Sequence, residues 1–159
     1  MAIQILTELV HPDGECKLEA CWDCNPPIVE KDERLYLGHI EAWRVWLAPR
    51  NNISTPILSP IWKTPWFPYE KKEAYDIPSA TNYDGIYGVK IRGDITPYTI
   101  YYPIKYLPLS GMVFLWGKMI EHEHGYRGQY GYPLGFIADS HPLATEYADL
   151  YGVPLLEKL

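Results

Sequence analysis

The sequence has no long apolar run and no leader-like beginning. None of its apolar stretches approaches the roughly 20 residues that a membrane-spanning helix needs. The first residues, Met1-Ala2-Ile3-Gln4-Ile5-Leu6, lack the basic start and the cleavage site of a secretory signal peptide. With 159 residues, the chain is long enough for one domain with its own core. We therefore expect a soluble, cytoplasmic protein that makes no contact with a membrane.

Basic residues are also scarce. The chain has 14 Lys and Arg against 20 Asp and Glu, which gives a formal net charge of −6. Its densest basic pair, Lys71-Lys72, is flanked by Glu70 and Glu73. Because affinity for duplex DNA comes mainly from clustered Lys and Arg on phosphates, we expect no direct duplex binding. The charge remains compatible with a small ligand, a single flipped base or a protein with a basic groove.

Phenylalanine is the rare aromatic residue here, with 3 Phe against 14 Tyr and 6 Trp. Tyr and Trp carry a polar group that needs a partner when buried, so they suit half-buried positions, groove walls and interfaces. A β-rich scaffold explains them equally well, because strands favour the same residues. The 15 Pro and 12 Gly interrupt long helices and favour short strands joined by turns.

These patterns predict an α+β protein: a curved, mostly antiparallel β-sheet or partial barrel with a C-terminal helix. Residues 1–37 form an N-terminal strand and a cysteine-containing excursion, and residues 38–159 form the main β-rich domain. The central prediction is a hairpin over residues 111–137, in which Gly117 marks a bulge or a close approach of two backbones. Tyr126, Tyr130 and Tyr132 then share one face of its second strand.

The rest of the main domain divides into shorter segments. In the strand at 40–47, Arg44 shares a face with Trp46, which places a cation beside an indole. A helix over 142–151, capped by Asp139 or Ser140, ends at Gly152. The remaining predictions are a Pro-rich loop or edge over 49–70, a short helical turn within 71–82, a strand over 83–90 and an edge or crossover over 95–106.

Three cysteines and one histidine lie within 14 residues near the N-terminus. Cys21 and Cys24 form a C-x-x-C pair, and His11 and Cys16 precede it. Zn²⁺ takes four tetrahedral nitrogen or sulfur ligands, so these four residues are a candidate structural zinc site. The alternative is a set of unrelated reduced cysteines, because three is an odd number for disulfides and a second pair is lacking.

A run of acidic and histidine residues, Glu121-His122-Glu123-His124, ends the first strand of the hairpin. The two histidines suit a metal, and a Glu–His pair suits a general base with its orienting group. No G-x-S-x-G nucleophile motif, Walker A or G-x-G-x-x-G motif accompanies them. A hydrogen-bonded network that holds the hairpin, or an Arg127–Glu121 ion pair, explains the run as well.

Aromatic and arginine residues make up a candidate ligand groove. Arg offers a planar fork that matches a carboxylate or a phosphate, and aromatic faces beside it stack a base or hold a cation. If Arg44 and Arg127 converge, they indicate an anionic ligand. The candidate ligand-binding residues are Arg44, Trp46 (or Trp43), Trp116, Tyr126, Arg127, Tyr130 and Tyr132.

The stretch Val113–Arg127, VFLWGKMIEHEHGYR, resembles the signature of an uncharacterised family of small prokaryotic proteins. In that family an LWG…V-x-E-H-x-x-G-Y-R-A hairpin leads into an A-Y-P strand. The A-W-R-x-W strand at Ala42–Trp46, with the later Ser59-Pro60, and the Y-G-V-P sequence at Tyr151–Pro154 match as well. The resemblance spans residues 38–154.

This chain departs from the family at two places. It has Gly128 where the family usually has Ala, and Asp84-Gly85-Ile86-Tyr87-Gly88 where the family commonly has C-G-I-Y-A. The resemblance marks Glu121-His122 and Tyr126-Arg127, and it implies a fold unit without an activity. The pattern is also similar, at the level of the fold, to small PUA-like barrels that handle nucleic acid or modified bases.

The sequence therefore predicts non-catalytic recognition of a nucleotide-like ligand or a macromolecular partner. Small size and acidic charge also suit an inhibitor in phage–host or mobile-element conflict, which presents carboxylates to a nucleic-acid-binding protein. The alternative is a hydrolase or transferase that acts through Glu121, His122 and Arg127. No cofactor is expected beyond the candidate zinc.

Overall fold

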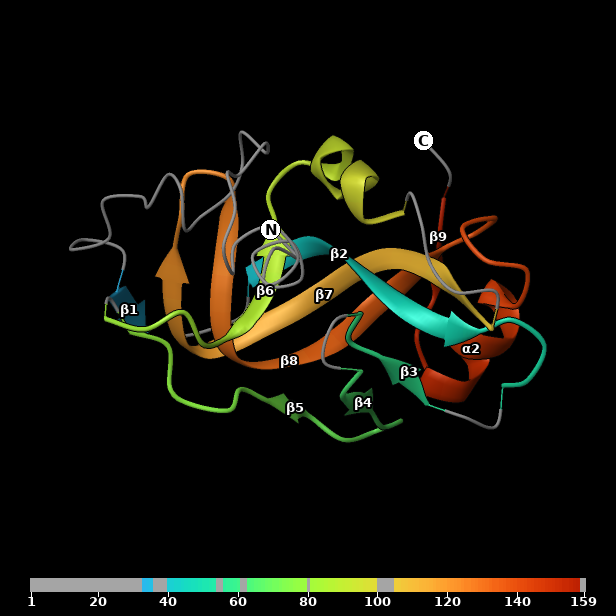
Figure 1. The fold of residues 1–159 in the computed structure, drawn as a ribbon, viewed down its shortest axis with the longest axis horizontal. Coiled ribbons are helices and arrows are strands. Elements are labelled where there is room, and N and C mark those ends of the chain that lie inside the picture. Colours follow the sequence, from blue (N-terminus) through green and yellow to red (C-terminus); the bar gives the residue numbers. More distant parts are fainter. Residues whose placement is uncertain are drawn as a thin grey trace.

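The computed structural model describes residues 40–53, 56–60, 63–79, 81–99 and 105–157, with the backbone alone at 33–35 and 97–98. Its longest elements are the strands β2, β7 and β8 (Figure 1). The elements are β1 (Glu33–Leu35), β2 (Ile40–Pro49), β3 (Ile57–Leu58), β4 (Pro65–Trp66), β5 (Lys72–Glu73), β6 (Ile86–Val89), the 3₁₀ helix η1 (Arg92–Thr99), β7 (Tyr106–Glu121), β8 (Gly125–Ile137), α2 (Ala144–Tyr151) and β9 (Leu155–Leu156).

Four strands close on themselves through their hydrogen-bonded pairings. β2 pairs along its whole length with β7, β7 pairs with β8, and β8 pairs with β6. β6 returns to β2 through the pair Trp43↔Val89, which completes the circuit. Of the pairings described, only β8 with β9 is parallel. The predicted α+β class, with a curved, mostly antiparallel partial barrel and a C-terminal helix, is confirmed.

The core lies between the curved sheet and α2. Trp46 is fully buried and meets the rings of Trp66 and Phe136 edge to face, at centroid distances of 5.5 and 5.4 Å. Tyr151 of α2 packs on Phe136, and its hydroxyl donates to the carbonyl of Trp66. Edge-to-face pairs of this kind add about 0.5–1.5 kcal/mol each beyond the area they bury. They attach β4 and α2 to the same part of the sheet.

The hairpin over 111–137 and its bulge are confirmed. β7 and β8 are antiparallel neighbours, and their register shifts between Trp116 and Met119. Gly117 lies in that shift with φ of 81°, a conformation that favours glycine. The strands predicted at 40–47 and 83–90 are present as β2 and β6. In the described part of the Pro-rich stretch at 49–70, β2 ends at Pro49 and the two-residue strands β3 and β4 follow.

Two segments differ from the sequence prediction. The expected helical turn within 71–82 is wrong, because Lys72 and Glu73 pair as β5 with Gly131 and Tyr130 of β8. Of the edge or crossover expected at 95–106, the edge strand is absent from the first part, where η1 runs from Arg92 to Thr99 between β6 and β7, two strands that are not neighbours in the sheet. β5 forms through pairing with residues far away in the sequence. η1 forms through tight local turns.

The helix begins two residues later than predicted, with Leu143 at its N-cap position and no side-chain capping bond, so the predicted cap at Asp139 or Ser140 is wrong. Just before the helix, His141 accepts the N–H of Leu143 at its Nδ1, at 2.9 Å. Its Nε2 therefore carries the proton and faces the carbonyl of Ala48 at 3.2 Å. The predicted stop at Gly152 is confirmed, with a left-handed φ of 66°. The hydroxyl of Ser140 instead bonds to the backbone of Ser110.

The described helices include none that is long and apolar enough to cross a membrane. The strand Glu33–Leu35, which the sequence placed with the N-terminal segment, pairs with Lys118–Ile120 of β7.

Gly88 tests the closure of the four-strand circuit. A Cβ at Gly88 would lie 2.6 Å from Cβ of Ala42 and 3.2 Å from Cγ1 of Val113. We expect Gly88→Ala to lower the free energy of unfolding by about 1–3 kcal/mol, measured by urea denaturation, because strands must separate to accept the methyl group.

Gly93→Ala is the matched control, because a Cβ there meets nothing within 4 Å. It should change stability by less than about 0.5 kcal/mol. Adding Ala42→Gly to Gly88→Ala should restore part of the loss. Equal stability of the two alanine variants would contradict close contact across the circuit.

Candidate functional site

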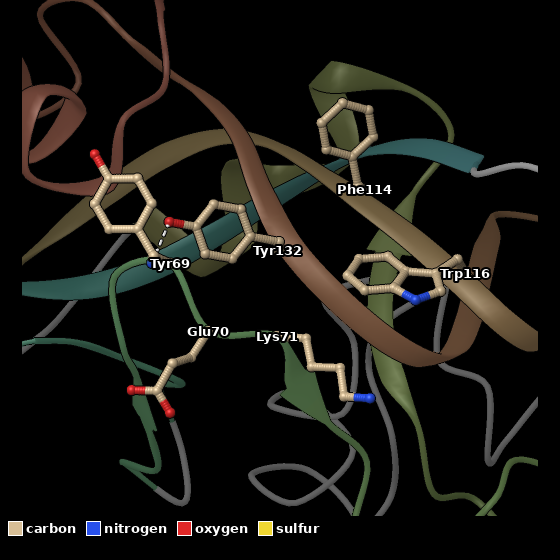
Figure 2. A pocket seen from close by; sticks show the side chains of 6 residues that line it. All are labelled: Tyr69, Glu70, Lys71, Phe114, Trp116 and Tyr132. Carbon is tan, nitrogen blue, oxygen red and sulfur yellow. Dashed lines mark hydrogen bonds between the residues drawn. The ribbon is translucent and has the colours of Figure 1, made fainter.

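Six residues surround an aromatic pocket with a volume of about 510 Å³ on the outer face of the hairpin (Figure 2). This volume lies within the usual range of small-molecule sites. The ring-bearing strands are β7 and β8, and the segment before β5 supplies the other side. The lining residues are Tyr69, Glu70, Lys71, Phe114, Trp116 and Tyr132.

The register of the hairpin explains why the rings converge. Phe114 lies opposite Tyr132, and Trp116 lies opposite Tyr130. Residues opposite each other on antiparallel strands share a face, with their side chains in contact range. The rings of Trp116 and Tyr130 are 5.9 Å apart and tilted by 34°. The hairpin therefore presents a continuous aromatic face beside the pocket.

Tyr132 fixes the opposite side of the pocket. Its hydroxyl accepts the N–H of Tyr69 at 2.8 Å and donates to the carbonyl of Tyr151 at 2.8 Å. Burial raises the pKa of Tyr132, so the phenol stays protonated and can make both bonds. Tyr69 itself has a φ of 61°, in the left-handed region. One phenol thus connects the segment before β5 to β8 and α2.

Two charged residues stand at the rim of the aromatic pocket. Glu70 and Lys71 are exposed, and Nζ of Lys71 lies 4.3 Å from the centroid of the Tyr130 ring. A cation at that distance is attracted to the face of the ring. The pocket therefore combines apolar walls with one cation and one carboxylate at its entrance.

Two of the three tyrosines of the predicted row lie beside the pocket. Tyr130 and Tyr132 lie on the pocket side of the hairpin, whereas Tyr126 lies near its tip, with Nζ of Lys90 at 5.3 Å from its ring. The extra residue at the Gly117 bulge belongs to β7, so the two-residue spacing of the tyrosines along β8 is unbroken. Tyr126 is therefore separated from the pocket by its position along the strand.

Trp46 and Arg44 lie away from the aromatic pocket. Trp46 belongs to the core, so its predicted place in the wall of a groove is corrected: tertiary packing by Trp66 and Phe136 covers it. Arg44 is 3% exposed, and its Cζ lies 5.9 Å from the centroid of the Trp46 ring, which confirms the predicted cation beside that indole. The ring of Trp66 is closer still, at 4.8 Å. Arg44 lines a different cavity, together with residues of β4, β5 and β6.

Arg127 is 2% exposed and holds the loop that precedes β6. Its Nε donates to Nε2 of His122 at 2.8 Å, and Nη1 donates to the carbonyls of Asn82 and Asp84, both at 2.8 Å. Nη2 donates to the carbonyl of Ser79 at 3.0 Å. Arg127 is not among the residues that line the cavity of Arg44, and its guanidinium donates to backbone carbonyls.

Glu121 takes a different partner from the one considered in the sequence. Its carboxylate pairs with Nζ of Lys90 at 2.7 Å, and both side chains are about one-third exposed. The bond from Arg127 goes to His122 instead of Glu121. The acidic and histidine run thus divides into a surface ion pair and a buried contact.

His122 is held as a neutral imidazole. Its Nε2 accepts a bond from Arg127, so a proton on that nitrogen would oppose the guanidinium. Burial, together with the charges of Arg127 and Lys90, lowers the pKa of His122 to about 3. A base of that pKa with an occupied lone pair is poorly matched to proton transfer at neutral pH.

The candidate zinc ligands His11, Cys16, Cys21 and Cys24 lie outside the described residues. Within the described ranges, no group of three His, Cys, Asp or Glu residues is placed to hold a metal ion.

Comparisons with protein families, curated proteins and solved structures find no match to this chain. The resemblance to the LWG…EH..GYRA family and to PUA-like barrels therefore stays a prediction.

Of the six residues that line the pocket, sequence reasoning found Trp116 and Tyr132 and missed Tyr69, Glu70, Lys71 and Phe114. Phe114 lies two residues before Trp116 on the same strand, so the two side chains share a face. The two-residue period of a strand could therefore have predicted Phe114 as a pocket residue. The other three belong to the Pro-rich stretch and its continuation, and their place against Tyr132 depends on contacts between distant segments.

We expect stability to fall as the pH is lowered from 6.5 toward 3. Unfolded His122 takes up a proton near 6.5, but folded His122 takes one up only near 3. In this window the unfolded state binds more protons, so up to about 1.4 kcal/mol is lost per pH unit. Burial lowers the pKa of His141 too, which adds to the loss in the same direction. Urea denaturation at a series of pH values measures the slope.

His122→Gln is the control, because glutamine offers Arg127 an acceptor without titrating. Its slope should be smaller than that of the wild type, with the remainder due to His141 and the carboxylates. An unchanged slope would show that His122 does not contribute.

Proposed function

We propose that this is a non-catalytic recognition protein whose aromatic pocket binds a flat, nucleotide-like ligand. The observation that carries the proposal is the convergence of Phe114, Trp116 and Tyr132 on one cavity, with Lys71 at its rim. A base has an apolar face that stacks on such rings, whatever its hydrogen-bonding pattern. The cation at the rim suits the negative charge of a phosphate.

The enzyme alternative has weaker support. Arg127 is engaged with three carbonyls and His122, and burial and neighbouring charges depress the pKa of His122. Glu121 is paired with Lys90 at the surface. These contacts favour a structural role for all three residues, which hold the hairpin tip and the loop at 79–84.

A second candidate is a protein partner, including the inhibitor role suggested by the acidic charge. Five large apolar side chains between residues 67 and 83 are exposed, and Tyr75 is 99% exposed. Such a concentration on one segment is typical of an interaction site. The five residues are Phe67, Tyr69, Tyr75, Ile77 and Tyr83.

Substitution of Trp116 tests the proposed pocket. Titration with adenosine, followed by NMR or calorimetry, should give binding that Trp116→Leu weakens about tenfold, because stacking on an aromatic ring contributes about 1–3 kcal/mol. Trp43→Leu is the matched control: it is another half-buried tryptophan on a strand, with Arg92 at 5.6 Å from its ring. It should leave the affinity unchanged.

Absence of binding by adenosine and other nucleosides would contradict the nucleotide-like ligand. Co-purification of a stoichiometric protein that releases when Tyr75 is replaced by Ser would favour the second candidate instead.

The rim cation gives a separate prediction. AMP should bind more tightly than adenosine, and Lys71→Met should remove that preference without affecting adenosine. Glu121→Gln should leave both affinities intact, since its carboxylate lies with Lys90 rather than in the pocket. If Glu121→Gln abolishes a measurable turnover while the fold is kept, the enzyme alternative is correct.

A further inference from the structure

The segment 69–71 supplies one side of the aromatic pocket without belonging to the sheet. β5 begins at Lys72, which pairs with Gly131 of β8. Continuation of that register would set Glu70 opposite Pro133, and proline has no N–H with which to extend the ladder. The segment therefore needs another attachment to keep its place beside the rings.

The hydroxyl of Tyr132 provides that attachment. It accepts the N–H of Tyr69 at 2.8 Å, the bond drawn in Figure 2, and donates to the carbonyl of Tyr151 at 2.8 Å. The bond from the N–H of Glu70 stays within the chain turn, at the carbonyl of Phe67. The Tyr132 hydroxyl thus joins the segment before β5 to β8 and to the end of α2.

Tyr69 has a backbone conformation that needs this outside support. Its φ of 61° lies in the left-handed region, which residues other than glycine adopt at a cost in free energy. Its side chain lies against the end of α2, because a Cβ at Gly152 would be 2.6 Å from Oη of Tyr69. Such a conformation persists where several contacts hold it, and here the bond to Tyr132 holds the backbone itself.

The position of Lys71 depends on this arrangement. Lys71 lies two residues after Tyr69 and directly before β5, and its Nζ is 4.3 Å from the centroid of the Tyr130 ring. In Figure 2 its side chain extends toward Trp116, whereas the carboxylate of Glu70 points away from the rings. Loss of the bond at Tyr69 therefore releases the chain on the N-terminal side of Lys71.

We propose that Tyr132 acts on the aromatic pocket in two separable ways. Its ring is part of the wall, and its hydroxyl is a positioning group that holds Tyr69 and, through Tyr69, keeps Lys71 at the rim. The inference rests on the proposed function, in which the rings stack a base and Lys71 contacts a phosphate. The hydroxyl of Tyr132 thus determines the preference for a phosphorylated ligand without touching the ligand.

A double-mutant cycle tests this route. Tyr132→Phe keeps the ring and removes the hydroxyl, so adenosine should bind within about threefold of the wild-type affinity, with the small loss due to a less ordered wall. The preference for AMP over adenosine should disappear. Lys71→Met should weaken AMP binding in the wild type and have no further effect in Tyr132→Phe, because residues that act through one contact are not additive. Calorimetry measures all four affinities.

Tyr147→Phe is the matched control. The hydroxyl of Tyr147 also reaches backbone groups, the carbonyls of Pro49 and Asn52 at 3.1 Å each, but Tyr147 does not line the aromatic pocket. Its removal should lower stability in urea denaturation, as Tyr132→Phe does, and leave the AMP preference intact. A merely structural role of Tyr132 predicts the same AMP preference in both variants.

Hydrogen exchange gives a readout that needs no ligand. The amide of Tyr69, followed by NMR, should exchange faster in Tyr132→Phe than in the wild type or in Tyr147→Phe, because its acceptor is gone. Equal exchange in all three proteins would contradict the proposed attachment.

Two affinity results would also overturn the inference: an AMP preference that survives Tyr132→Phe, or an equal effect of Lys71→Met in both backgrounds. Either result leaves the proposed function standing, because the wild type still binds the nucleotide. Failure of the wild type to bind adenosine and AMP would instead refute the proposed function, and this inference with it.

Discussion

β7 and β8 are the two longest strands of the described sheet, and the positions of the other elements depend on their register. β2 and β1 add to β7, while β6, β5 and β9 add to β8. The same register sets Phe114 opposite Tyr132 and Trp116 opposite Tyr130. A shift by one residue would exchange the two faces and move these rings toward the core. The fold and the aromatic pocket therefore depend on one set of hydrogen bonds.

Buried polar side chains hold the irregular segments against this sheet. Arg127 donates to the carbonyls of the loop at 79–84, and Tyr132 bridges Tyr69 to α2. Tyr151 similarly accepts the N–H of Ile57 and donates to Trp66. Loop carbonyls in a folded chain need partners, and a long arginine or tyrosine reaches several at once. Tyr132 and Tyr151 thus supply hydrogen-bond partners to the irregular segments as well as apolar area to the core.

The sequence predicted the elements whose signals are local. Apolar alternation located β2, the hairpin carries its own bulge glycine, and Gly152 ends α2. It did not predict β5, because the strand exists only through pairing with Gly131 and Tyr130, more than 50 positions further along the chain. Trp46 and Trp116 look alike in sequence, yet packing by Trp66 and Phe136 buries only the first. For Arg127, the sequence alone does not distinguish a bound phosphate from the carbonyls of a loop as the partner of its guanidinium. The tertiary fold decides between them.

β5 shows how two residues of sequence serve two separate cavities. Lys71 borders the aromatic pocket with Tyr69 and Glu70, whereas its neighbour Lys72 borders the cavity of Arg44 with Glu73, Ala74 and Tyr75. The chain thus passes from one cavity to the other between residues 71 and 72. The bonds from Tyr69 N–H to Tyr132 and from Ala74 N–H to the carbonyl of Gln129 flank β5 and fix its register on β8. A slip of one residue would move a lysine from one cavity to the other, so these two anchors keep the charge of each cavity distinct.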